Sequence, residues 1–130
     1  MAGITGATRT ETNLLIDNIT LNNLRSAYTS NSLSTDFYRN FILYIHVTSE
    51  GEPTDIVFEV QFSHDNVTWY KYMNDFFGDL RYEDTATASP GLYESVSALC
   101  AGRYMRVKIT GTGTASSDTF TATVYAEFYT

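Results

Sequence analysis

Apolar and polar residues alternate with a period of two in three segments of the chain. Such alternation is typical of a β-strand that turns one face to a core and the other to solvent. The pattern predicts strands over Ile56–Phe62, Met105–Ile109 and Thr119–Phe128. We expect one shared core built from inward side chains of these strands together with a single tryptophan: Phe58, Val60, Phe62, Trp69, Val107, Phe120, Val124 and Phe128.

A fourth segment, Phe41–Val47, is apolar on both faces apart from Tyr44 and His46. It is therefore predicted to be a central strand or a strand covered on its outer side. Weaker strand candidates are Leu14–Leu21, Asn23–Tyr28, Thr68–Tyr72 and Tyr93–Leu99. Clusters of Gly, Pro, Ser, Asp and Asn between these segments favour turns.

Helical patterning is weak throughout, since at most Met73–Phe77 could form one turn. Many short strands separated by turns predict an all-β fold, a single antiparallel β-sandwich of the jelly-roll or galactose-binding-like type. The first thirteen residues are small and polar and lack periodicity. We therefore expect an extended N-terminal arm over 1–13 and a sandwich domain over 14–130. Because the arm has little apolar surface, we expect it to contact a neighbouring subunit, with Ile4 as its anchor.

The chain has 130 residues, 43% of them hydrophobic, which suits one folded core. Its net charge of −7 repels phosphate backbones and anionic lipid, so we expect no nucleic acid and no membrane as partners. The N-terminus lacks a basic start followed by an apolar run, and we expect no signal peptide. Cys100 is the only cysteine, so no disulfide can form within the chain, and we expect a buried, inert thiol, with a disulfide to another chain as the alternative.

Candidate catalytic material is sparse. Ser63–Asp65 contains the residue types of a nucleophilic triad, but consecutive residues in a turn cannot converge on one reaction centre. His46 lies in an apolar strand and is expected to be a packed or interface residue. A loop of acidic residues lacks the spacing of a calcium loop and is interpreted as solvated: Asp75, Asp79, Glu83 and Asp84. We therefore expect no enzymatic activity, no metal and no cofactor.

Aromatic residues are abundant, with ten Tyr, eight Phe and one Trp, more than a core of this size needs. Several are concentrated between Trp69 and Phe77 and cannot all point inward. Exposed aromatic side chains form either a protein interface or a platform on which sugars stack, and the interface is favoured here. We accordingly assign partner binding to five residues: Ile4, Tyr70, Tyr72, Phe76 and Phe77.

Two segments resemble known sandwich proteins. Phe58–Trp69 (FEVQFSHDNVTW) resembles the V-Q-x-S-x-D-G-x-x-W hairpin of discoidin-like, galactose-binding-type sandwiches. Ala101–Ile109 (AGRYMRVKI) resembles their G-R-Y-x-R-V strand. Closely similar pairs occur in small jelly-roll proteins of tailed-phage particles. The chain lacks the paired cysteines of secreted discoidin domains, which favours the comparison with virion proteins.

This resemblance implies a structural virion protein, most specifically a capsid decoration or cement protein that binds and stabilises the phage shell. Its place would be the virion, and its partners the major capsid protein or other virion proteins. It also implies a homo-oligomer, for which a trimer is the expectation. The alternatives are a structural component of the neck or tail, or a glycan-binding module of a tail or fibre protein.

Overall fold

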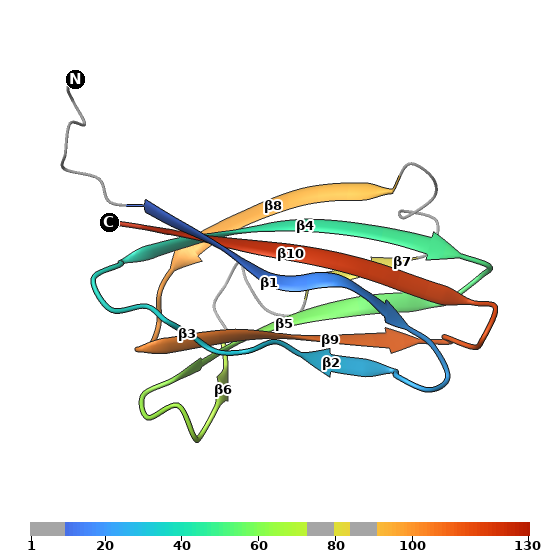
Figure 1. The fold of residues 1–130 in the computed structure, drawn as a ribbon, viewed down its shortest axis with the longest axis horizontal. Coiled ribbons are helices and arrows are strands. Elements are labelled where there is room, and N and C mark those ends of the chain that lie inside the picture. Colours follow the sequence, from blue (N-terminus) through green and yellow to red (C-terminus); the bar gives the residue numbers. More distant parts are fainter. Residues whose placement is uncertain (1–9, 73–79, 84–90) are drawn as a thin grey trace.

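The computed structural model describes residues 10–72, 80–83 and 91–130, and these fold as two antiparallel sheets packed face to face (Figure 1). The predicted all-β sandwich is therefore confirmed. The described ranges contain no helix, and hence none that is long and apolar enough to cross a bilayer. The strands are β1 (Thr10–Leu21), β2 (Ala27–Thr29), β3 (Leu33–Ser34), β4 (Asn40–Glu50), β5 (Asp55–Ser63), β6 (Tyr70–Lys71), β7 (Leu80–Glu83), β8 (Leu92–Leu99), β9 (Tyr104–Thr112) and β10 (Thr119–Tyr129).

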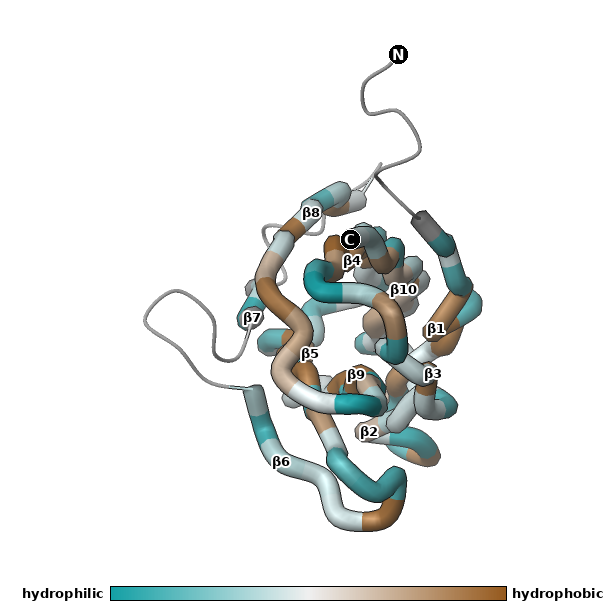
Figure 2. Tube along the Cα trace, turned by 90° about the vertical axis from the view of Figure 1, so that its left-hand side faces the viewer, coloured by the Kyte–Doolittle hydropathy of each residue, from teal (hydrophilic) through white to brown (hydrophobic). Residues whose placement is uncertain are grey.

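The first sheet has the strand order β1-β10-β4-β8. The second has the order β2-β9-β5-β6, with β3 also pairing with β9 and β7 with β5. Figure 2, which looks along the strands, shows the two layers; the buried side chains of both sheets form one core cluster. Strand order in both sheets differs from chain order, so segments that are distant in the sequence become neighbours on one surface.

The core confirms the three alternating strands. In β5, β9 and β10 every second side chain is buried, and in register Val60 lies opposite Val107. Full burial of a large apolar side chain contributes about 1.5–3 kcal/mol relative to its exposure. The largest fully buried side chains include Phe41, Phe58, Phe120, Phe128, Ile16, Leu21, Leu43, Ile56, Met105 and Ile109.

Strand β4 is central, as predicted, because it pairs with β10 on one side and with β8 on the other. Its inward residues are buried, whereas Tyr44 on its outer face is exposed. The weaker candidates Leu14–Leu21 and Tyr93–Leu99 lie within β1 and β8. Asn23–Tyr28 is strand only from Ala27, because Asn22 and Arg25 exchange backbone hydrogen bonds in a turn. Of the candidate strand Thr68–Tyr72, only Tyr70–Lys71 forms a strand, β6. Met73–Phe77 lies outside the described residues.

The placement of Trp69 in the core was wrong. The side chain is only partly buried and does not belong to the core cluster. Its ring lies beneath the guanidinium of Arg106, whose carbon is 4.3 Å from the ring centroid. Arg106 alternates with the buried residues of β9 and so points outward, which places Trp69 on the outer face of the second sheet. Tyr72, by contrast, packs against the core cluster, and its ring centroid is 5.3 Å from that of the buried Phe62.

The boundary of the N-terminal arm also needs correction. Thr10–Asn13 belongs to β1 and pairs in register with residues 126–129 of β10, so the sandwich begins at Thr10 rather than at Leu14. Polar residues can extend an edge strand because the ladder is made by backbone groups, and threonine is favoured in strands. Residues 1–9, including Ile4, lie outside the described residues, and their contact with a neighbour stays a prediction.

Candidate functional site

The Ser63–Asp65 segment forms a turn, as expected, and its polar groups bond to one another. Ser63 Oγ donates to Asp65 Oδ1 at 3.0 Å and accepts the backbone N–H of Asn66 at 2.8 Å. The backbone N–H groups of Thr68 and Val67 donate to Asp65 Oδ1, both at 2.9 Å, and these bonds lower the pKa of Asp65 to about 2. The three residue types of a triad therefore shape a turn and leave no free nucleophile–base pair there.

Metal-binding and thiol chemistry find little support in the described part of the chain. There, no group of three or more His, Cys, Asp or Glu residues converges on one point. Of the four acidic residues considered for calcium, only Glu83 lies in a described element, β7. Cys100 is free and partly buried, and burial raises the pKa of its thiol to about 11. A thiol with so high a pKa stays protonated at neutral pH and is a weak nucleophile.

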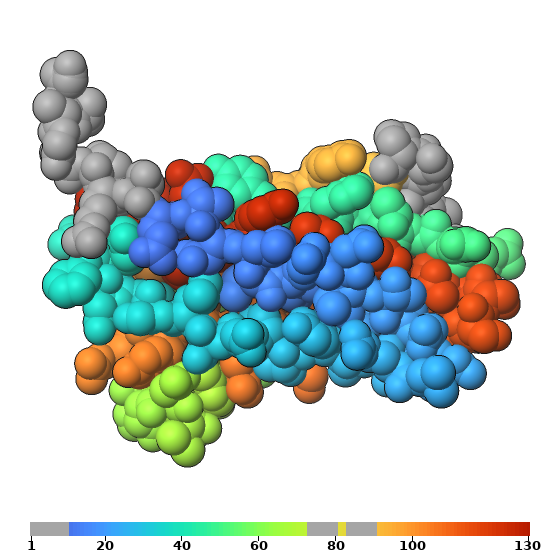
Figure 3. Space-filling model, viewed as in Figure 1, coloured from blue at the N-terminus to red at the C-terminus, as the bar shows by residue number. Residues whose placement is uncertain are grey.

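The hairpin around β6 carries two of the predicted partner-binding residues. Figure 3 shows this hairpin as a lobe that projects from the body of the sandwich. Tyr70 is 57% exposed and stacks with His64, whereas Tyr72 packs edge-on against Phe41 and Phe62. Both tyrosines line an open depression of about 380 Å³. Tyr70 is therefore presented to solvent and Tyr72 to the core, while Ile4, Phe76 and Phe77 lie outside the described residues.

A second aromatic surface covers the outer face of the first sheet. We call it the tyrosine face and define it by Tyr44, His46, Tyr93 and Tyr125. In register, Tyr125 of β10 lies opposite Tyr44 of β4, and on the next outward row His46 of β4 lies opposite Tyr93 of β8. All three tyrosine side chains are exposed: Tyr44 by 41%, Tyr93 by 68% and Tyr125 by 44%. An open depression of about 470 Å³ lies among them, flanked by the hydroxyl side chains of Ser95 and Thr123.

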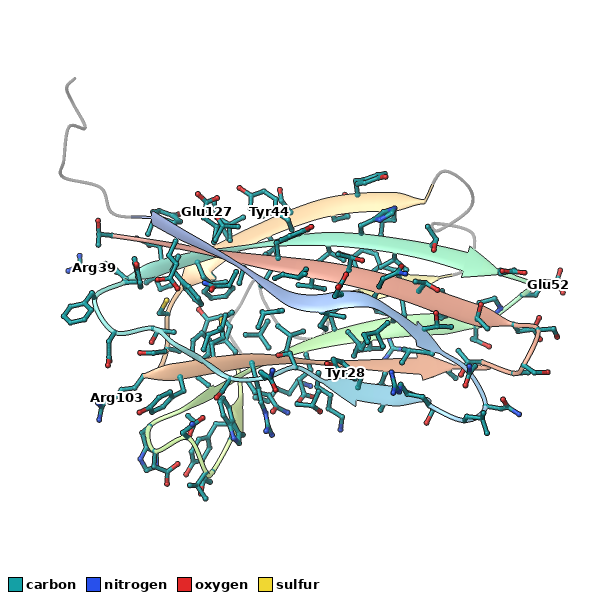
Figure 4. The ribbon with its side chains drawn as sticks, in the orientation of Figure 1. Tyr28, Arg39, Tyr44, Glu52, Arg103 and Glu127 are labelled. Atoms are coloured by element: carbon teal, nitrogen blue, oxygen red, sulfur yellow. The ribbon has the colours of Figure 1, made fainter. Side chains whose placement is uncertain are left out.

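Two contacts fix the orientation of these rings. The Tyr44 hydroxyl donates to Glu127 Oε1 at 2.8 Å, and this bond to a carboxylate raises the pKa of Tyr44. Figure 4 shows the two side chains together on the side of the sheet that faces away from the second layer. The rings of His46 and Tyr93 stack with centroids 4.1 Å apart and an interplanar angle of 11°. The tyrosine face is therefore largely ordered before anything binds to it.

His46 is packed, as expected from its apolar strand. Its Nε2 atom is buried and has no hydrogen-bond partner among the described residues. Gly91, whose φ of +105° suits glycine, lies so close that an added Cβ would be 3.1 Å from this nitrogen and 2.8 Å from the Val47 carbonyl oxygen. Because Nε2 is covered in this way, His46 contributes its ring to the surface rather than a free nitrogen.

Sequence reasoning missed the tyrosine face. Tyr125 stood among the polar outward residues of its strand, and Tyr44 and His46 were exceptions in an apolar one. The available signal was that each lies at an outward position of its strand. Only the order β10-β4-β8 brings these positions together, and periodicity does not give strand order.

Comparison with known proteins shows the fold alone. No protein-family model matches the chain, and no curated protein matches its sequence significantly. The PBSX exported protein XepA is similar in structure, with a TM-score of 0.61 and 12% identity over 91% of this chain and 36% of that one. VP2 of the infectious bursal disease virus subviral particle has a TM-score of 0.53 and 10% identity over 95% of this chain and 33% of its own. The chain thus spans about a third of the length of each of these proteins, and what it shares with them is the β-sandwich fold.

Proposed function

We propose that the chain is a structural, non-catalytic module of a virus particle, and specifically a decoration protein that docks onto the shell through the tyrosine face. The observation that carries the proposal is the group of exposed tyrosine rings on three adjacent strands, of which Tyr44 and Tyr93 are held by neighbouring side chains. Tyrosine is enriched at the centres of protein interfaces, because it combines a large apolar ring with a polar tip.

The orientation of the rings favours binding energetically. Ordering a mobile side chain at an interface costs about 0.5–1.5 kcal/mol. Tyr44 is already held by Glu127, and Tyr93 is already stacked on His46, so docking loses less of this freedom. On a shell the modest affinity of one copy would be multiplied by linked contacts among many copies. The similarity to XepA and VP2 supports a virion module only by analogy of fold.

The test is a particle-binding experiment with three proteins: the parent chain, the double variant Tyr44→Ala/Tyr125→Ala, and Tyr70→Ala as a matched control. Each protein is added to shells that do not already carry the parent chain, and the number of copies that sediment with the shells is measured. We expect the double variant to lose at least about tenfold in affinity, equivalent to about 1.4 kcal/mol, while its Tm stays near that of the parent. Tyr70→Ala should bind like the parent. Undiminished binding of the double variant would refute docking through this face, and loss only with Tyr70→Ala would move the site to the hairpin.

A glycan-binding role is the second candidate, and the depression of about 470 Å³ favours it. Sugar rings stack on aromatic faces while their hydroxyls bond to nearby polar groups, and Ser95 and Thr123 flank the rings here. A glycan array separates the candidates. Saturable binding that Tyr93→Ala abolishes, together with no binding to shells, would replace the docking proposal. If the protein bound to shells but to no glycan on the array, the docking proposal would be supported.

A further inference from the structure

Among the strands that the structure describes, β8 forms an unusually open sheet edge. Native sheets protect their edges by bulges, charges or very short strands, because an unpaired edge can pair with another chain. At the opposite edge of the same sheet, β1 has two register shifts, and Asn18 there has a φ of +52°. Among the described strands of the second sheet, the outer ones β2, β3, β6 and β7 have two to four residues each. Strand β8 has eight residues and pairs with β4 without a register shift. Figure 1 shows it beside β4 at the margin of the first sheet.

The direction of its free backbone groups follows from one hydrogen bond. Just beyond β8, the N–H of Cys100 donates to the carbonyl oxygen of Arg39 at 2.7 Å, which places these two residues at the position of a hydrogen-bonded pair, next to the Leu99–Asn40 pair; the Arg39 N–H itself donates to Tyr129. In an antiparallel ladder such pairs alternate with pairs that exchange no hydrogen bonds. The even-numbered residues of β8 therefore bond to β4. The odd-numbered residues direct their N–H and C=O groups along the open edge: Tyr93, Ser95, Ser97 and Leu99.

We propose that a second copy of this chain pairs with β8 in antiparallel fashion, about a two-fold axis at Val96. In this register Tyr93 lies opposite Leu99 of the other copy, and Ser95 lies opposite its Ser97. Tyr93 and Leu99 are 68% and 59% exposed in the single chain, and both are on the outer face. An aromatic side chain opposite an aliphatic one, and hydroxyl opposite hydroxyl, are favourable cross-strand pairs.

Neighbouring registers are less favourable. An axis at Ser95 places Tyr93 opposite Ser97 and carries Leu99 past the end of the partner strand. An axis at Glu94 sets two carboxylates opposite each other, whereas the axis at Val96 sets Glu94 opposite Ala98. Like charges directly opposite each other destabilise a strand pair. The pairing uses each β8 edge once, so it closes as a dimer and does not continue into a fibre.

This dimer extends the proposed function without depending on it. It joins the two first sheets into one continuous sheet and brings the two tyrosine faces side by side. It gives a two-fold assembly in place of the trimer that the sequence resemblance implied. Self-pairing is measured as the mass of the free protein, without shells. A failure of self-pairing can therefore be told apart from a failure of shell binding.

The first test compares Ser95→Pro with Ser95→Ala by light scattering over a range of concentrations. Proline removes the outward N–H of residue 95, which β4 does not use, and proline is tolerated on strand edges. We expect the parent and Ser95→Ala to have twice the monomer mass and Ser95→Pro to be a monomer with the parent's far-ultraviolet circular dichroism. A monomeric parent at every concentration, or a folded Ser95→Pro dimer, would overturn the proposal.

Cross-linking tests the register independently and needs no disruptive variant. Ser95→Cys and Ser97→Cys are each made in a Cys100→Ser background, mixed under reducing conditions and then oxidised. Only the mixture should give disulfide-linked dimers, because in this register residues 95 and 97 of different copies are opposite. Two copies of residue 95 would be too far apart, since bridged Cα atoms lie about 4.4–6.8 Å apart. Cross-linking of Ser95→Cys with itself, or none in the mixture, would refute the axis at Val96.

Discussion

The two outer faces of the sandwich arise from the same alternation but differ in chemistry. On the second sheet, the Arg106 Nε–H donates to Gln61 Oε1 at 2.6 Å, Gln61 donates to Glu59, and Glu59 lies opposite Lys108. At one end of that face Arg81 bridges to Asp55. The first sheet presents the tyrosine face instead, with hydroxyl side chains around it.

This difference shows which face is suited to binding. Charged groups on the second sheet find partners within their own sheet, and exposed ion pairs of this kind contribute at most about 1 kcal/mol each. A partner that covered them would have to desolvate them again. On the tyrosine face the rings leave apolar area in solvent, and burying that area is favourable. Both faces depend on the same core, because the core packs the two sheets together and fixes which side chains of each strand point outward.

The largest expected effect comes from damaging that shared core. Phe58 is fully buried, and its ring packs edge-on against Tyr82 with centroids 5.7 Å apart. Phe58→Ala should lower the free energy of unfolding by about 3–5 kcal/mol, as other large-to-small core substitutions do. That is a large share of the 5–15 kcal/mol typical of a domain. Urea unfolding followed by circular dichroism measures it, and a loss below about 1 kcal/mol would contradict the packing.

A smaller effect is expected on the charged face. Trp69→Ala should cost about 1 kcal/mol, because the variant mainly loses an Arg106 cation–π contact at a partly exposed site. Arg106→Gln is the matched variant, since it removes the cation and leaves the ring. If Trp69→Ala cost as much as Phe58→Ala in the same urea titration, Trp69 would belong to the core after all.

Trp69 and the tyrosine face show what the sequence can predict and where it stops. Period-two alternation identified β5, β9 and β10 and their inward faces, because alternation reflects which side of one strand is buried. Trp69 was misplaced because it lies just before the short β6, where no alternation indicates a face. The tyrosine face was missed because it depends on three strands that are not consecutive in the chain. Tyr70, by contrast, was selected as an exposed aromatic, and its partner binding stays a prediction.

A pH-dependent effect is expected at the turn that leads into β6. The hydrogen bonds of Thr68 and Val67 lower the pKa of Asp65 from 3.8 to about 2. A carboxyl group whose pKa is lower in the folded state stabilises the fold fully above about pH 4 and loses that contribution as the pH falls toward 2. The Tm of the parent should therefore exceed that of Asp65→Asn at neutral pH, and the gap should narrow between pH 4 and 2. A gap that stays constant over this interval would rule out titration of Asp65 as its source.

The smallest expected effect sharpens the description of the tyrosine face itself. Glu127 raises the pKa of Tyr44 by accepting a hydrogen bond from its protonated hydroxyl and by placing negative charge beside the phenolate that would form. In an ultraviolet titration of the tyrosines, Glu127→Gln should move one ionisation toward lower pH, because the amide keeps an acceptor but removes the charge. Tyr44→Phe should delete that same ionisation and leave the Tm unchanged, since the pair is at the surface and exposed pairs add little stability. If Glu127→Gln left the titration curve of the parent unaltered, Tyr44 would not be held by Glu127. The ordering of the tyrosine face before binding would then rest on the His46–Tyr93 stack alone, and docking would have to order the Tyr44 ring, at a higher cost in side-chain entropy.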